Sequence, residues 1–260
     1  MSRNTATIDG SKEKRRYLTL LAGTVALIGS LFIGIAAGAV PITLREVFEV
    51  IQGVTQSENY RIIYYIRMPR VICAALTGTN LALAGCILQG ILRNPLADPG
   101  IIGVTAGAGL AAMALMLISP ELTYFVPFAA FGGAVVASIV VFLLAWEHGI
   151  HPLRLILAGV AIAAFFGGGS AALSVFFSDR IQGTVNWMAG GFAGNSWRHV
   201  VMILPYSAVG IVATMCSYRK LNALQLGDDV AASLGLNVER VRFFLLALSA
   251  LLAASAVSVA

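Results

Sequence analysis

Residues 93–109 read RNPLADPGIIGVTAGAG, a stretch that holds two prolines, four glycines, an arginine and an aspartate between two long apolar runs. Proline and glycine at this density interrupt a helix. In the hydrocarbon of a bilayer, an interrupted backbone is tolerated only where protein or a water-filled cavity satisfies its polar groups. The stretch therefore indicates that the apolar chain around it forms a passage rather than a simple anchor.

The composition around this stretch is typical of a membrane protein. Hydrophobic residues make up 58% of the 260 residues and charged residues only 11%, whereas soluble domains carry about 25% charged residues. Apolar runs of about 20 residues, enough to cross a bilayer as a helix, recur along the chain. We predict an all-α, polytopic transmembrane helix bundle with about seven spans, at residues 17–40, 68–92, 100–118, 125–146, 153–177, 199–217 and 241–260.

The positions of lysine and arginine orient these spans. All seventeen lie outside the proposed spans or at their ends, and a cytoplasmic N-terminal segment at 1–16 places eleven of them inside and six outside. Because cytoplasmic loops are enriched in lysine and arginine, we expect the N-terminus in the cytoplasm. The net charge of +5 mostly reflects the lysines and arginines that orient the spans, and it gives no reason to expect a nucleic-acid partner.

Residues with catalytic or metal-binding chemistry are sparse. Cys73, Cys86 and Cys216 lie in or at the ends of predicted spans, and their spacing matches no metal site. His148 and His151 form an isolated pair at a predicted membrane boundary. We therefore predict no metal site, no cofactor and no catalytic residue on this chain. The sequence lacks the G-x-x-x-x-G-K-[ST] phosphate loop, so any ATP-driven work needs a separate ATPase chain.

The first outer loop, residues 41–67, contains a short amphipathic helix. Thr43 and Glu46 fit a capping box at its start, and Gly53 fits its end. Such a helix either packs on its own bundle or binds a partner, and the sequence leaves both alternatives open. Its apolar face consists of Leu44, Val47, Phe48 and Ile51.

The segment Ile66-Arg67-Met68-Pro69-Arg70 leads into the second span. Proline fits the first turn of a helix, where its missing N–H costs nothing. Arg67 and Arg70 are three residues apart and share one helix face at the outer rim. Two guanidinium groups there can hold either a lipid phosphate or an acidic protein partner, and the chemistry alone favours membrane lipid.

Polar and small residues interrupt two of the predicted spans. Asn80 and Gln89 lie in the second span, and Gly167-Gly168-Gly169-Ser170 lies in the middle of the fifth. Polar residues inside a membrane usually face the bundle or a cavity, and small residues let helices approach closely. Tight packing and pathway lining both fit these residues. Three consecutive glycines also predict a bend or a close crossing.

Two loops carry further signals. The outer loop 178–198 contains Trp187, Trp197 and several glycines, which predict a tight, re-entrant shape at an external mouth. In the cytoplasmic loop 218–240, Asp228 or Asp229 can cap a short helix that Gly235 ends. This loop is unusually apolar, so it either docks another protein or folds against the base of the bundle. Its apolar residues include Leu221, Leu224, Leu226, Leu234 and Leu236.

These segments resemble the permease subunits of bacterial ABC importers for iron–siderophore complexes, vitamin B12 and haem, the FecCD or BtuC type. The landmarks occur in family order at family spacing and cover nearly the whole chain, and RNPLADPG is the most specific of them. They are IRMPR (66–70), LAGCILQGILRNPLADPGIIGVTAGAG (83–109), LILAGVA (155–161), WMAGGFAGNSWR (187–198) and LNALQLGDDVAASLGL (221–236).

The resemblance implies roles for specific residues. Arg67 and Arg70 are expected to pair with acidic residues of an extracytoplasmic substrate-binding protein, which replaces lipid as their expected partner. The loop before the seventh span is expected to couple to the ATPase, through Leu226, Gly227, Asp228, Asp229, Ala231, Leu234 and Gly235. The expected pathway-lining residues are Asn80, Gln89, Gly167, Gly168, Gly169 and Ser170.

The resemblance also implies an assembly in the bacterial cell membrane. It consists of two permeases, identical or sister chains, with two ATPase subunits that bind ATP and Mg on one side and a binding protein on the other. The expected function is ATP-driven uptake of a ferric siderophore by alternating access, with vitamin B12 or haem as alternative cargoes. The family has ten spans, so a single transmembrane domain at 1–260 is expected to be incomplete at its C-terminus.

An ion-coupled secondary transporter is the alternative from another class. Such proteins often place acidic residues in the middle of the membrane. No aspartate or glutamate lies near the centre of any predicted span, which disfavours this alternative. A membrane enzyme is disfavoured too, because no histidine or lysine lies within a span to activate Ser170.

Overall fold

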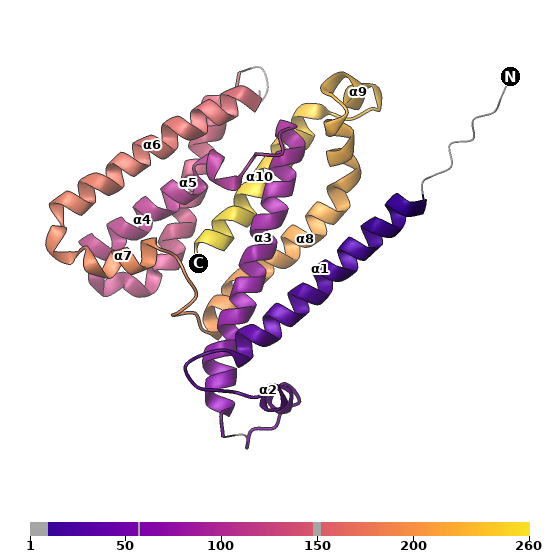
Figure 1. Ribbon diagram of the computed structural model, residues 1–260. Helices are drawn as coiled ribbons and strands as arrows, with labels where there is room; N and C mark the ends of the chain where they lie inside the picture. Colours follow the sequence, from indigo (N-terminus) through magenta and orange to yellow (C-terminus); the bar gives the residue numbers. More distant parts are fainter. Residues whose placement is uncertain (1–9, 57, 148–151) are drawn as a thin grey trace. The chain divides into compact units, whose positions relative to one another are not determined.

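The computed structural model describes residues 10–56, 58–147 and 152–260, and the regular elements in them are helices (Figure 1). The chain divides into two compact units, Met1–Ile72 and Cys73–Ala260, and each is described by itself. Of the predicted cytoplasmic segment 1–16, residues 1–9 lie outside the described part, and the others already belong to the first helix.

The first unit is built on one long helix. It contains α1 (Gly10–Ala36), α2 (Leu44–Ile51), the π-helical η1 (Ile62–Arg67) and the first turn of α3 (Met68–Leu92). A small core joins them, in which Val47 and Val50 of α2 pack with Ile35, Ile42 and Ile63. Most other apolar side chains of α1 are exposed, which is the pattern of a helix that faces lipid.

The capping box predicted at Thr43 is confirmed. The backbone N–H of Thr43 donates to Glu46 Oε2 at 2.7 Å, and the backbone N–H of Glu46 donates to Thr43 Oγ1 at 3.4 Å. The bonds from the backbone and hydroxyl of Thr43 and from the amide of Asn59 lower the pKa of Glu46. Because the lowered pKa belongs to the folded state, this cap stabilises α2 above the unfolded pKa and is lost as the pH falls through the folded one. Gly53 follows α2 in the left-handed region, with φ +88°.

The helix around Pro69 is longer than predicted. Pro69 does lie in the first turn of α3, but η1 extends the helical run back to Ile62, which gives one apolar span at Ile62–Leu92. In η1 the Met68 N–H bonds to the Ile63 carbonyl, five residues back. This wider turn precedes the residue whose ring and missing N–H would disturb a regular α-turn.

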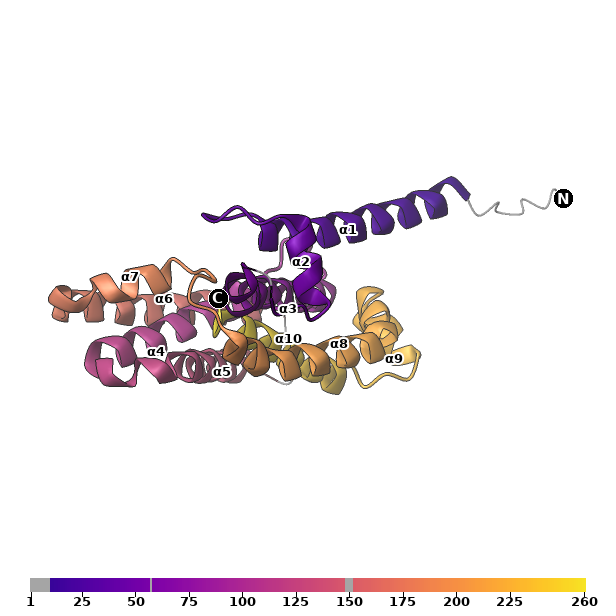
Figure 2. The same ribbon diagram turned by 90° about the horizontal axis from the view of Figure 1, so that it is seen from below.

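The second unit holds the remaining helices around α10. In Figure 2, α6 and α7 lie on one side and α4 and α5 on the other. In Figure 1, α10 passes behind α3 and ends on the side of α5. Ser249 of α10 donates to the carbonyl of Ala84 in α3 at 3.2 Å. Their bounds are α4 Val104–Ile118, α5 Val126–Ala145, α6 Pro152–Phe176, α7 Gln182–Met188, α8 Trp197–Gln225, α9 Asp228–Ser233 and α10 Val238–Val257.

Six helices in the described residues are long and apolar enough to cross a membrane. In the span predicted at 100–118 the α-helical part is shorter than predicted, because α4 has only 15 residues, about 22 Å against a hydrocarbon core of about 30 Å, and a 3₁₀ turn makes up the rest of the segment. Pro99 starts a 3₁₀ turn, η2 (Pro99–Ile102), and Gly103 follows with φ +71°. The six spans are Glu13–Ala36, Ile62–Leu92, Pro120–Ala145, Leu153–Phe176, Trp197–Gln225 and Val238–Val257.

A close backbone contact between two α-helices lies outside the glycine triplet of α6, where α4 crosses α5. Gly107 of α4 and Gly133 of α5 face each other, and a Cβ on either would overlap the backbone of the other. Around Gly167 and Gly168 the space is open, and α6 runs as a single α-helix through them. At Gly169 a Cβ would lie 3.1 Å from Leu110 Cδ1 of α4, which fits the close approach predicted for the triplet, whereas a bend there stays a prediction. The triplet is tolerated because the surrounding turns of α6 keep their α-helical form.

We expect Gly107→Ala to destabilise the protein by about 1–3 kcal/mol, because the added methyl group overpacks a backbone crossing. Gly168→Ala is the matched control, since its methyl group enters open space on a helix and should stabilise by about 0.4–1 kcal/mol. Denaturant unfolding of the detergent-solubilised chain measures both. Equal effects of the two substitutions would contradict the crossing.

Candidate functional site

The short helix α9 lies between the ends of α8 and α10 (Figure 1). Gly227 precedes it with φ +121°, a conformation that favours glycine. Gly235 follows it with φ +82°. The N–H of Gly235 bonds to the Ala232 carbonyl at 2.9 Å, and the N–H of Leu236 bonds to the Ala231 carbonyl at 3.1 Å. This pair of bonds forms a Schellman motif and confirms that Gly235 ends the helix.

The predicted cap of this helix is wrong. The N-cap residue is Gly227, and no side chain caps the helix start. The Asp228 carboxylate instead accepts hydrogen bonds from Arg242 Nη2, at 2.8 Å to Oδ1 and 3.0 Å to Oδ2, and from Arg93 Nη2. Two guanidinium groups are stronger donors than a backbone N–H, so they take the carboxylate.

The two sides of α9 differ. Ala231 is fully buried and packs in the core of the second unit, so its side chain faces inward. Leu226 is 66% exposed and Leu234 is 62% exposed. The loop predicted at 218–240 is also shorter, because α8 continues to Gln225 and α10 begins at Val238. An exposed apolar surface beside charged groups is therefore available at this end of the unit.

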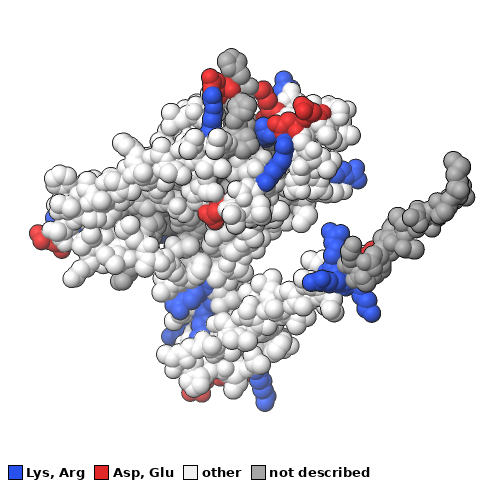
Figure 3. Space-filling model, turned by 45° about the horizontal axis from the view of Figure 1, so that its top comes forward, with Lys and Arg blue, Asp and Glu red and all other residues white. Residues whose placement is uncertain are grey.

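Charged side chains gather over the same end of the unit (Figure 3). Below them the flanks of the helices are almost uniformly uncharged (Figure 3). This distribution fits a water-facing end above a lipid-facing wall. The charged residues of the turns around α9 include Arg93, Asp228, Asp229, Glu239 and Arg240.

The stretch 93–103 is irregular but well satisfied. The Leu96 N–H donates to Asn94 Oδ1 at 2.9 Å, and the Gly100 N–H donates to Asp98 Oδ1 at 2.7 Å. In η2, the Ile101 carbonyl lies against Gly159 of α6, where a Cβ would overlap it. The break in the helix therefore satisfies part of its own backbone; Ala97, Pro99 and Ile102 are buried, while Arg93, Leu96 and Asp98 are exposed.

Arg67 lies inside the first unit rather than on its surface. The side chain is 7% exposed, and its guanidinium donates to the carbonyls of Ile35 at 2.9 Å, Ala36 at 2.7 Å and Val40 at 2.6 Å. Ile35 and Ala36 are the last residues of α1, whose final carbonyls have no partner within the helix. Arg67 therefore caps α1, and its guanidinium does not present the outward-facing group expected for docking. Arg70 is half-buried.

The predicted lining residues are not brought together. Asn80 is fully buried, and its Nδ2 donates to Ser255 Oγ of α10 at 2.9 Å. Gln89 is exposed, and its Nε2 donates to the Ala97 carbonyl at 3.4 Å. Gly169 packs against Leu110, and the Ser170 hydroxyl donates to the Phe166 carbonyl of its own helix. Pathway lining by these residues stays a prediction.

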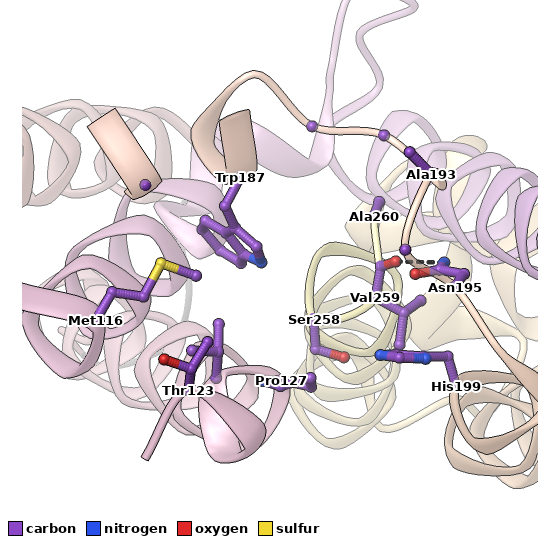
Figure 4. Close-up of a pocket in the computed structure, with 15 residues that line it drawn as sticks. Met116, Thr123, Pro127, Trp187, Ala193, Asn195, His199, Ser258, Val259 and Ala260 are labelled. Atoms are coloured by element: carbon purple, nitrogen blue, oxygen red, sulfur yellow. Dashed lines mark hydrogen bonds between the residues drawn. The ribbon is translucent and has the colours of Figure 1, made fainter. Parts of the chain in front are cut away.

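A pocket of about 410 Å³ lies beside the loop that the sequence placed at an external mouth (Figure 4). Trp187 of α7 and Met116 of α4 form one wall, and Asn195 and His199 lie on the other. Asn195 Nδ2 donates to the Val259 carbonyl at 2.7 Å. Sequence reasoning marked the glycines, Trp187 and the segment of Asn195 in this loop, but it gave no signal that His199 of α8 and Val259 after α10 complete the pocket.

The described residues contain no group of three or more His, Cys, Asp or Glu side chains that could hold a metal ion. His148 and His151 lie outside the described residues. The absence of a metal site on this chain stays a prediction.

A model of the FecCD transport family matches residues 26–260. The chain belongs to the FecCD transport family. Its fold is accordingly that of a multi-pass membrane permease, and the predicted all-α polytopic bundle is confirmed.

Individual relatives agree with this membership. The Fe(3+)-citrate import system permease protein YfmE of Bacillus subtilis (strain 168) is 37% identical over 249 residues, which cover 95% of this chain and 74% of that protein. The cobalamin import system permease protein BtuC of Halobacterium salinarum is 36% identical over 196 residues, 75% of this chain and 53% of that protein. A solved metal-chelate type ABC transporter in an inward-facing conformation matches with a TM-score of 0.78 and 26% identity, over 94% of this chain and 76% of that one.

We expect Arg67→Ala to destabilise the first unit by at least about 1–3 kcal/mol, the cost of one buried carbonyl left without a donor. Arg67→Lys should recover only part of this loss, because one ammonium group cannot reach all three carbonyls that the planar guanidinium contacts. Denaturant unfolding in detergent measures the change. Arg61→Ala removes an exposed arginine of the same unit and serves as the control. A cost no larger for Arg67→Ala than for Arg61→Ala would refute the cap.

Proposed function

We propose that this chain is the translocation subunit of an ATP-driven importer that carries a ferric chelate, most simply a ferric siderophore, across the bacterial cell membrane. The observation that carries the proposal is the 37% identity to an Fe(3+)-citrate import permease over 95% of the chain. The metal-chelate type transporter with the same fold also supports it. Haem and vitamin B12 are the alternative cargoes, and the similarity to a cobalamin permease favours the second of these.

In this proposal α9 is the surface on which a separate ATPase acts. The exposed Leu226 and Leu234, which flank this helix, offer an apolar contact, and Asp229 adds a charge beside them. Gly227 and Gly235 give the turns on either side the positive φ angles they need. A rigid, protruding helix of this kind suits insertion into a cleft on another protein. ATP and Mg would bind to the ATPase and not to this chain.

The proposed orientation places α9 and the N-terminus in the cytoplasm. The excess of lysine and arginine on that side supports it. The loop with Trp187 and the pocket of Figure 4 then face outward, where the binding protein would deliver cargo. The guanidinium of Arg67 holds the end of α1, so the proposed docking of that protein involves the half-buried Arg70 of the same segment.

Transport would proceed by alternating access in a dimer of permeases, identical or sister chains. ATP binding would favour one arrangement of the bundle and hydrolysis the other, so that a central cavity opens to one side at a time. The chain performs no covalent step in this scheme. Asn80, Gln89 and the 167–170 stretch remain candidates for lining that cavity.

We expect Leu226→Glu combined with Leu234→Glu to reduce the ATPase that co-purifies with the chain by about tenfold, because charges replace the apolar contact. Asn222→Glu adds a negative charge to an exposed position of α8 one turn earlier and should leave the yield unchanged. The measurement is affinity purification of the detergent-solubilised complex with quantification of the ATPase. An intact chain that retains no ATPase in its native form would argue for the ion-coupled alternative.

We expect Arg70→Glu to weaken binding-protein docking by about tenfold at low salt and less at high salt, since salt screens the charge. Arg45→Glu reverses an exposed charge on α2 and tests whether any outer arginine suffices. Surface plasmon resonance with the immobilised complex gives both affinities. Docking unaffected by Arg70→Glu would return this arginine to lipid phosphate.

A further inference from the structure

Asp228 joins α9 and the next helix, α10, to the end of α3, which lies 135 residues away in the sequence. Arg93 follows the end of α3, Arg242 lies in the second turn of α10, and both guanidinium groups donate to this one carboxylate of α9. Hydrogen bonds in which both partners are charged are shorter and stronger than neutral ones. The carboxylate is therefore a fixed point between α3, α9 and α10.

The contacts of Arg93 and Arg242 with the Asp228 carboxylate form a bridge, and the burial of Arg242 anchors one side of it. The side chain of Arg242 is 7% exposed, whereas those of Asp228 and Arg93 are 48% and 42% exposed. A buried guanidinium is costly unless hydrogen-bond acceptors or an opposite charge lie nearby, and the Asp228 carboxylate supplies both to Arg242. The partly exposed pair of Asp228 with Arg93 is thus attached to an anchored one.

Arg93 is held in an unfavourable backbone conformation. Its φ is +48°, in the left-handed region that residues other than glycine avoid. Such strain persists only where surrounding contacts impose it. Here the side chain donates to Asp228 and, through Nε at 3.0 Å, to the Leu224 carbonyl of α8. The start of the broken stretch 93–103 is therefore fixed by side-chain bonds to α8 and α9.

The other end of the stretch is fixed by packing. The Ile101 carbonyl lies against Gly159 of α6, with no room for a Cβ between them. A displacement of α9 can therefore pass through Asp228 to Arg93, along residues 93–103, and into α6. The connection runs through contacts that have little freedom to yield.

We propose that Asp228, bridged to Arg93 and Arg242, is a positioning residue that makes the stretch 93–103 move together with α9. The inference rests on the proposed role of α9 as the surface on which the ATPase acts. Breaking the bridge leaves the exposed Leu226 and Leu234 beside α9 unchanged, so the ATPase stays bound. Hydrolysis then continues, but the stretch no longer follows α9 and import stops.

Arg93→Gly is the decisive variant. Glycine suits the positive φ at this position, the bond between Asp228 and Arg242 remains, and only the Arg93 side chain is lost. Asp228→Asn is the second variant, which keeps the size of the side chain and removes its charge. Glu239→Gln removes an exposed negative charge from the first turn of α10 and is the control.

The first measurement is a distance between two spin labels in the purified chain alone. One label replaces Leu96, which is 83% exposed in the broken stretch, and the other replaces the exposed Ala232 on α9. The native Cys73, Cys86 and Cys216 are first changed to serine or alanine. We expect a narrow distance distribution in the parent chain and with Glu239→Gln, and a broad one with Arg93→Gly and Asp228→Asn.

The second measurement is the cargo imported per ATP hydrolysed by the complete complex in proteoliposomes, with ferric citrate as the probe. We expect Arg93→Gly to lower this ratio by about tenfold or more, the size of a typical coupling between sites, with the ATPase still bound. Distance distributions and an import ratio that do not change with Arg93→Gly would overturn the inference. A parent complex that binds no ATPase would refute the proposed function instead, and the distance measurement would still decide the bridge.

Discussion

The requirement that every backbone polar group inside a bilayer find a partner within the protein governs this structure. It explains why the irregular residues 93–103 satisfy their own turns through Asn94 and Asp98 and pack the Ile101 carbonyl against Gly159 of α6. It also explains the position of Arg67, whose guanidinium donates hydrogen bonds to carbonyls at the end of α1. Both sites are places where a helix stops, and each is supplied with hydrogen-bond partners from the same unit.

Local patterns in the sequence predicted most of the helices. The capping box at Thr43, the end of α9 at Gly235 and most spans after residue 120 depend on residues close together in the chain, and they are found within a few residues of the predicted places. The exception is α8, which continues to Gln225 instead of ending at residue 217. The short α4 was missed because its apolar composition continues into residues that proline and glycine keep out of an α-helix. Periodicity reports apolar length, and it does not report where the backbone changes its hydrogen-bonding pattern.

The candidate site was only partly predictable, for a different reason. The apolar character of the leucines beside α9 was predicted from the sequence. The partners of Asp228 were not, because they lie 135 and 14 residues away and no residue near Asp228 indicates them. Arg67 shows the same limit. A charged residue at a membrane rim fits lipid, a partner protein or the protein's own backbone, and only the position of α1 decides between them. Charge identifies a residue that needs a partner without identifying the partner.

The glycine crossing of α4 and α5 has a consequence for how the bundle can change shape. Where Gly107 meets Gly133, backbone touches backbone, so no side chain is present to switch rotamer and absorb a shift. The same holds where Gly159 meets Ile101. Contacts between two backbones cannot adjust by a change of rotamer, so α4, α5, α6 and η2 should move as one rigid body. Any hinge of the second unit must then lie at contacts made by side chains, where one helix can slide past another at a small cost in free energy.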